Sequence, residues 1–182
     1  MTNSENLRDI VCDLLLEIER EQTPSHVAIR RMLEKYQYLS AGERRFISRL
    51  TRGTLERQIT LDWMIERFSS VKIKKMKPVI RTILRMSVYQ IKYMDGVPES
   101  AVCNEAVKLA KKRGFKNLSG FVNGILRNMI RNPEKLEVPK DNLSVCYSQP
   151  QWLADYNWAM PAVILMTIWS NVGYSSLIYA SA

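Results

Sequence analysis

The residues that most often carry out chemistry in proteins are few in this chain. Its three cysteines, Cys12, Cys103 and Cys146, lie far apart and form no C-x-x-C pair, and His26 is its single histidine. This set is too small and too dispersed for a zinc site of the usual type, so we expect no metal site. Isolated cysteines in odd number indicate a reducing compartment, and we expect a cytoplasmic protein in which each cysteine is a small filler residue.

Carboxylates and glycine-rich turns give no better indication of a catalytic site. Glu17 and Glu19 point apart when residues 5–21 are placed on a helix, so we expect both to be solvated charges. No Gly-x-Gly-x-x-Gly turn follows a predicted strand, which leaves no phosphate cradle for a dinucleotide-like cofactor. We therefore predict no catalytic residue and no cofactor-binding residue in this chain.

The charge of the chain points to binding rather than to catalysis. Lysine and arginine together number 27 and aspartate and glutamate 18, which gives a net charge of +9 at neutral pH. Such a charge indicates a polyanionic partner, with nucleic acid favoured over a membrane surface. The alternative is a soluble basic protein that has no such partner.

The positive charge is concentrated in two stretches that contain no acidic residue, 67–94 and 106–133. We take candidates for phosphate contact from these stretches and from the basic pair that follows residue 43. They are Arg44, Arg45, Lys74, Lys75, Lys77, Arg81, Lys111, Lys112 and Arg113. For any single candidate a solvated surface role is a somewhat better interpretation, so the two stretches carry more weight than any member.

The elements that must position these residues are helices. Apolar residues recur at helical spacing within about residues 5–21, 25–36, 60–68, 78–94, 98–114 and 118–131, and Ser40 and Glu43 form a capping box that opens a further helix. Pro78 and Pro98 suit the first turns of the helices that they open. No strand pattern occurs in the first 150 residues. The predicted fold class is all-α, a bundle of about seven helices in two halves.

Helical geometry also assigns faces to individual residues. Four cations of the helix at 78–94 fall about a quarter turn from its apolar stripe and should form a continuous ridge: Lys77, Arg81, Arg85 and Lys92. Val27 is expected on the inward face of the helix at 25–36. Gly120 and Gly124 lie one turn apart and leave a strip of the helix surface without side chains. Another helix, or less readily a phosphate backbone, can approach this strip closely.

Two sequence motifs resemble a known family. Residues 89–111 form a helix, an Asp-Gly turn and a Pro-initiated helix, and residues 120–127 read Gly-Phe-Val-Asn-Gly-Ile-Leu-Arg. Together they resemble the NusB-like all-helical RNA-binding domain. The closer resemblance is to the version at the N-terminus of the RsmB (Sun) family of small-subunit rRNA cytosine-5 methyltransferases, and it covers residues 7–153. It implies an RNA-binding module that targets 16S rRNA. The alternative is a stand-alone NusB-type transcription antitermination factor, which binds RNA and a protein partner and would end near Arg131.

The resemblance also shows what is missing. In the RsmB family the nucleophilic cysteine and its helper follow prolines or threonines in a catalytic domain that uses S-adenosylmethionine. No cysteine here follows either residue, so no catalytic position can be carried over and we expect the chain alone to be inactive. The family's recurrent motif positions correspond to Asn104 and Asn123, with Arg127 beside the second. We add all three to the candidate RNA contacts, although a local hydrogen bond explains either asparagine at least as well.

The predicted domain organisation has three parts. Residues 1–135 form the RNA-binding domain, and residues 136–155 form a linker and the segment that leads into a methyltransferase. Residues 156–182 form an uncharged apolar tail, either helical or disordered, in which residues 158–174 resemble a membrane-spanning helix of sugar-type ABC transporter permeases. We interpret the tail as foreign sequence joined to a truncated methyltransferase. A membrane partner follows only if the tail is native, and the sequence leaves open whether the module also binds a protein or a second copy of itself.

Overall fold

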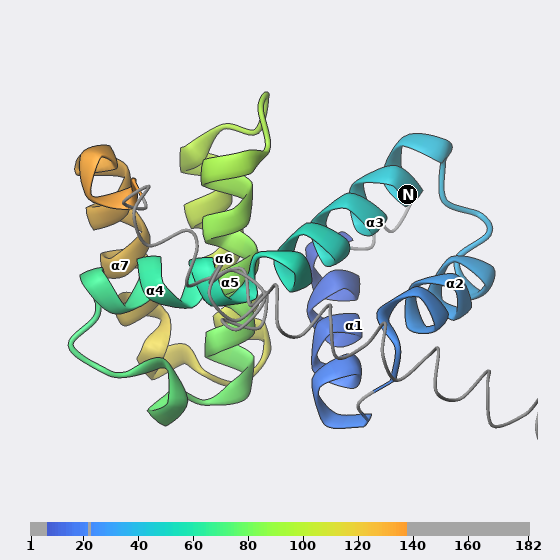
Figure 1. Cartoon of the computed structure of the whole chain (residues 1–182), viewed down its shortest axis with the longest axis horizontal. Helices are drawn as coiled ribbons and strands as arrows, with labels where there is room; N and C mark the ends of the chain where they lie inside the picture. The colour runs from blue at the N-terminus through green and yellow to red at the C-terminus, as the bar shows by residue number, and fades with distance from the viewer. Residues whose placement is uncertain (1–6, 22, 138–182) are drawn as a thin grey trace, which may run out of the picture. The chain divides into compact units, whose positions relative to one another are not determined.

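The computed structural model describes residues 7–21 and 23–137, and every regular element among them is helical (Figure 1). The seven α-helices are α1 (Leu7–Glu21), α2 (Ser25–Lys35), α3 (Ala41–Glu56), α4 (Gln58–Phe68), α5 (Pro78–Tyr93), α6 (Glu99–Lys112) and α7 (Ser119–Arg131). Three short 3-10 helices connect or follow them: η1 (Ile73–Lys75), η2 (Lys116–Leu118) and η3 (Pro133–Leu136). The all-α prediction is confirmed. The predicted linker beyond residue 137, the segment at 147–153 and the tail at 156–182 lie outside the described residues.

Local sequence explains where several helices begin and end. The Ser40 hydroxyl accepts a hydrogen bond from the Glu43 amide at 3.3 Å, and a Glu43 carboxylate oxygen accepts one from the Ser40 amide at 2.8 Å, so the predicted capping box is present. Hydrogen bonds from Ser40 also lower the pKa of Glu43. Pro78 occupies the first turn of α5 as predicted, whereas Pro98 is the N-cap of α6 rather than part of its first turn.

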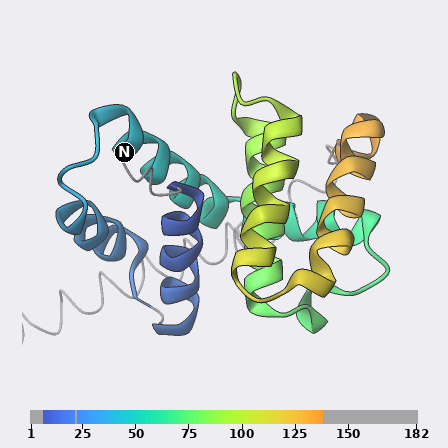
Figure 2. The same ribbon diagram turned by 180° about the vertical axis from the view of Figure 1, so that it is seen from behind.

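Helix α5 is the centre of the bundle. It packs against α1 and α3 on one side and against α4, α6 and α7 on the other, which gives the predicted two halves (Figures 1 and 2). Every residue from Thr82 to Gln90 is buried, because a helix with neighbours on all sides buries more than one stripe. The buried Gln90 amide is satisfied: it donates to the Met86 carbonyl at 3.0 Å and accepts from the Arg8 guanidinium at 2.8 Å.

The crossing of α3 and α5 depends on a glycine. A Cβ atom added to Gly53 would lie 2.0 Å from both Cζ and the hydroxyl oxygen of Tyr89, so the tyrosine side chain rests directly against the backbone of α3. Both residues are buried. A glycine inside a helix destabilises it by about 1 kcal/mol relative to alanine, and here close packing between the two halves offsets that cost.

Two expectations about individual residues are corrected by the fold. Val27 is 38% exposed and not inward, because α2 packs mainly on α1 and α3 among the described helices and buries Ala28 and Ile29. Within the described residues no helix approaches the strip at Gly120 and Gly124, since a Cβ added at either glycine would meet nothing within 4 Å. Between residues 7 and 137, no helix combines the length and apolar character needed to cross a membrane.

Candidate nucleic-acid interface

Helix α1 neutralises part of the predicted cationic surface. The Lys112 ammonium lies 2.5 Å from a carboxylate oxygen of Asp9, and Arg113 bonds Asp9 through two guanidinium nitrogens and Asp13 through a third at 2.5 Å. Burial by itself would raise the pKa of Asp9, but the hydrogen bonds from Lys112 and Arg113 outweigh it and lower that pKa. Both cations were selected as RNA contacts, and in the folded chain both are paired with acids more than 90 positions away.

The predicted ridge along α5 is wrong at Arg85. Its guanidinium is buried and forms a bidentate pair with Asp62 of α4, at 2.6 and 2.7 Å. The neighbouring Arg81 is 16% exposed and bonds Glu19 of α1 at 2.5 Å, so Glu19 is not the solvated charge that its sequence position indicated. The ridge is therefore reduced to its two exposed ends, Lys77 and Lys92. The physical reason is that α5 has no acidic residue of its own, but acidic side chains of α1 and α4 pack beside it and pair with its arginines.

Four of the predicted lysine contacts are exposed and form no ion pair with any described residue: Lys74, Lys75, Lys77 and Lys111. The first three belong to η1 and to the turn that leads into α5, and Lys111 is in the last turn of α6. In both ribbon views η1 and the C-terminal end of α6 lie at the same end of the half of the bundle that contains α4, α5, α6 and α7 (Figures 1 and 2). The structure thus places these lysines at a common end of the bundle.

The two asparagine positions differ in their surroundings. Asn104 is exposed on α6. Asn123 is half-buried on α7 and its side-chain oxygen accepts a hydrogen bond from the Arg127 guanidinium at 3.0 Å, one helical turn away. This bond is the local hydrogen bond that we gave as the alternative to an RNA contact for Asn123. Arg127 itself is exposed and remains a candidate.

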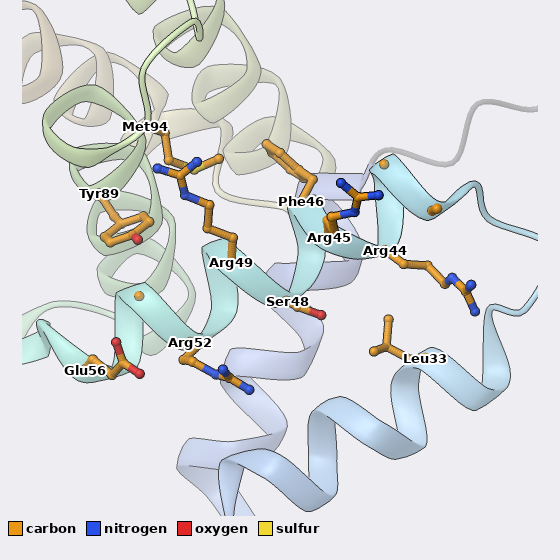
Figure 3. A pocket seen from close by; sticks show the side chains of 13 residues that line it. Leu33, Arg44, Arg45, Phe46, Ser48, Arg49, Arg52, Glu56, Tyr89 and Met94 are labelled. Atoms are coloured by element: carbon orange, nitrogen blue, oxygen red, sulfur yellow. The ribbon is translucent and has the colours of Figure 1, made fainter.

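A hollow of about 860 Å³ lies along α3 and contains the other two predicted contacts, Arg44 and Arg45 (Figure 3). We call it the α3 hollow. Its lining also includes Arg49 and Arg52, which are not among the predicted contacts. All four arginines are exposed, and within the described residues none has an acidic partner. Glu56 is the single acid in the lining.

The four arginines stand in two rows on α3. Arg45 and Arg49 are one turn apart, and Arg49 extends towards Met94 while Arg45 lies beside Phe46. Arg44 and Arg52 are two turns apart on the side of Leu33 (Figure 3). The Arg44 row also lines a second hollow of about 560 Å³ between α2 and α3. Spacings of four and eight residues were the signal in the sequence that could have identified Arg49 and Arg52, because such spacings align side chains along one helix.

The predicted site residues do not form one continuous surface. The α3 hollow reaches Met94 at the C-terminal end of α5, whereas Lys77 precedes its N-terminus. At 1.5 Å per residue, α5 separates these two groups by about 24 Å. The hollow thus concentrates positive charge on one side of the bundle, and the exposed lysines form a second, separate group.

The chemistry available at these surfaces is the binding of anions. Arginine forks suit phosphate oxygens, whereas the two described cysteines are buried free thiols. Burial raises the pKa of Cys12 to about 12 and also raises the pKa of Cys103, so neither is a thiolate at neutral pH. Their interpretation as core filler is confirmed, and the arginine hollow is the stronger candidate site.

Comparison with known proteins places this geometry in a family. The model of the NusB family matches residues 5–131. The chain is 35% identical over 158 residues to a probable ribosomal RNA small subunit methyltransferase B of Bacillus subtilis (strain 168), covering 85% of this chain and 35% of the relative. It is 30% identical over 125 residues to the transcription antitermination protein NusB of Acetivibrio thermocellus, covering 68% of this chain and 86% of the relative.

A solved structure has the same fold. It contains the antitermination factors NusB and NusE in complex with double-stranded RNA, and its similarity to this chain has a TM-score of 0.62 at 19% identity, over 69% of this chain and 93% of that one. The chain spans about a third of the length of the methyltransferase relative that it matches. Three observations agree: the family match over residues 5–131, the bundle of seven α-helices among the described residues, and the 30% identity to a NusB protein over 86% of its length. The chain belongs to the NusB family.

Proposed function

We propose that this chain is an RNA-binding module and that it directs a small-subunit rRNA cytosine-5 methyltransferase to its substrate. The observation that carries RNA binding is the group of four exposed arginines in the α3 hollow, none of which has an acidic partner among the described residues. Phosphate contacts by arginine supply most of the affinity of such modules. The names of the relatives, a ribosomal RNA methyltransferase and an antitermination factor, support the same class of ligand.

The extent of the match favours the methyltransferase over the antitermination factor. The similarity to the methyltransferase covers 85% of this chain, whereas the similarity to NusB covers 68%. The additional part of the match favours a protein in which the bundle is followed by further sequence of the methyltransferase type. Stand-alone antitermination is the second candidate, supported by the coverage of 86% of the NusB relative.

Methyl transfer would belong to the part of the longer relatives that this chain does not cover. S-adenosylmethionine would be held there, and the two described thiols are too deeply buried to attack a base. We therefore expect this chain alone to transfer no methyl group to rRNA. Labelling of cytosine by the chain with radioactive S-adenosylmethionine would contradict this expectation. The free thiols of the described core also fit a reducing, cytoplasmic location.

The test of RNA binding uses the full chain and fragments of small-subunit rRNA in a salt series. The Arg44→Ala/Arg45→Ala variant should reduce the magnitude of the slope of log affinity against log salt by about 1.4 to 1.8, since each phosphate contact contributes about 0.7 to 0.9. The matched control, Arg20→Ala/Arg30→Ala, removes two arginines that are exposed but paired with glutamates. Equal changes in both variants would mean that only net charge matters, and no salt dependence in the unmodified chain would refute RNA binding.

The choice between the two candidates requires a protein partner in the assay. NusE accompanies NusB in the solved complex. Tighter binding of this chain to RNA in the presence of NusE would favour an antitermination role. Binding to small-subunit rRNA fragments that is indifferent to NusE would favour a role in methylation.

A further inference from the structure

The α3 hollow has an apolar floor beneath its cationic rim. Phe46 of α3, Tyr89 of α5 and Met94 after α5 line one part of it, and Leu33 lies across the helix (Figure 3). A site that held only phosphates would need donors and no apolar surface. The floor therefore indicates that the ligand presents a flat or apolar group as well as an anionic one.

The floor is held in place by packing. The Tyr89 ring lies against Gly53, where a Cβ atom would approach it to 2.0 Å, and Met94 is 8% exposed, so neither side chain can move far from its position. The guanidinium of Arg8 lies over one face of the Phe46 ring, 5.5 Å from its centroid, in a cation–π contact. A ligand would therefore meet a preformed surface, which reduces the entropy lost on binding.

The rim above this floor offers directed donors. The Arg49 guanidinium donates to the Tyr93 carbonyl at 3.2 Å, which fixes its position while most of its five N–H groups stay available. Arg45 lies one turn earlier on the same side of α3 (Figure 3). Two arginines beside an aromatic and a thioether side chain match the contacts that unstacked bases and their phosphates make with proteins.

We infer that the α3 hollow accepts an unstacked nucleobase of the bound RNA against the half-buried Phe46, with the buried Tyr89 and Met94 behind it, while Arg45 and Arg49 hold the adjoining phosphates. This inference rests on the proposed RNA binding and assigns base contacts to it. An acidic peptide with an apolar side chain would present similar features. RNA is favoured because four of the five charged residues in the lining are arginines, and the planar fork of arginine both bonds phosphate and stacks on bases.

The experiment compares two ligands of equal length and charge. One is a mixed-sequence single-stranded oligoribonucleotide, and the other is the same backbone without bases. The full chain should bind the intact oligonucleotide roughly 5- to 150-fold more tightly, which is the range for one base stacked on an aromatic side chain. The slope against log salt should be the same for both ligands, because their phosphate contacts are the same.

A substitution connects the effect to the hollow. Phe46→Leu keeps an apolar side chain in the core but removes the ring, so it should weaken binding of the intact oligonucleotide and leave binding of the base-free backbone unchanged. Phe115→Leu is the matched control, since Phe115 is also half-buried against the core but lies between α6 and α7. Circular dichroism of both variants verifies that the helices are retained.

The outcomes separate this inference from the function on which it rests. Absence of binding to both ligands would refute RNA binding itself. Equal affinity for the two ligands, or equal effects of Phe46→Leu and Phe115→Leu, would overturn the base pocket and leave a phosphate-binding module. If polyglutamate of equal charge binds as tightly as the intact oligonucleotide and is weakened in the same way by Phe46→Leu, the hollow serves a protein partner and the inference is overturned.

Discussion

Removal of the Asp62 carboxylate tests whether Arg85 belongs to the core rather than to an RNA-binding ridge. The Arg85 side chain is 9% exposed and its two bonds to Asp62 measure 2.6 and 2.7 Å. In Asp62→Ala the nearest remaining acid is Glu19, which lies 3.9 Å from the guanidinium. The substitution therefore leaves a buried cation with a single distant partner.

The size of the effect follows from the burial of the pair. Breaking a buried ion pair on one side costs about 3 to 5 kcal/mol. Asp62 is 22% exposed, so water can partly replace the lost carboxylate and we expect about 3 kcal/mol. For a domain of this size that loss lowers Tm by about 10 °C. Replacing both partners, as in Asp62→Leu/Arg85→Met, should restore most of the stability because no unpaired charge is then buried.

Urea unfolding followed by circular dichroism measures these changes. Asp13→Ala is the matched control, because it also removes an aspartate paired with an arginine but one whose side chain is 58% exposed. It should cost no more than about 1 kcal/mol. RNA affinity should not fall in either variant, since both remove a negative charge. Equal destabilisation by Asp62→Ala and Asp13→Ala would refute the assignment of Arg85 to the core.

Three further predictions concern other parts of the bundle. The folded-state pKa of Asp9 lies below its ordinary value of 3.8, so the stability contributed by Asp9 is complete above about pH 4 and is lost as the pH falls through the folded-state pKa. Urea unfolding at acidic pH should therefore show a steeper loss in the unmodified chain than in Asp9→Asn, and parallel curves would contradict this. Gly53→Ala should destabilise by about 1 to 3 kcal/mol because its Cβ meets the Tyr89 ring, whereas Gly42→Ala, with its nearest neighbour at 3.9 Å, should be neutral or stabilising by thermal melting. Ser40→Ala should cost about 1 kcal/mol in the same assay through loss of the capping box, and an unchanged Tm would disprove that role.

Much of the fold could be predicted because its signals are local. The capping box at Ser40, Pro78 in the first turn of α5 and helical spacing of apolar residues act within a few positions of one another. Helix boundaries agreed to within a few residues, as for α4, which begins at Gln58 instead of near residue 60. Val27 was assigned wrongly because the spacing of residues shows that a helix has an inward face but does not show how few neighbours cover it.

The residues of the candidate site were harder to predict from the sequence than the fold. Arg44 and Arg45 were predicted as contacts, yet Arg49 and Arg52 complete the α3 hollow and were not predicted. The reason is that α3 contains Glu43 and Glu56 and therefore does not stand out as an acid-free stretch. The apolar floor of the hollow could not be derived at all. It requires the end of α5 to lie against α3, which depends on the packing of a tyrosine ring on Gly53.

The sequence by itself determined an all-helical, strongly basic chain of the NusB family and the positions of its positive charges. Only the tertiary structure decided which of those charges are available to a ligand. Asp9 and Asp13 pair with Arg113 across about 100 residues of sequence. Asp62 and Glu19 likewise pair with Arg85. A stretch of sequence that contains no acid can therefore have acidic side chains beside it in the folded chain. The physical reason is that charges interact over a few ångströms, whatever their separation in sequence, and folding alone sets those distances.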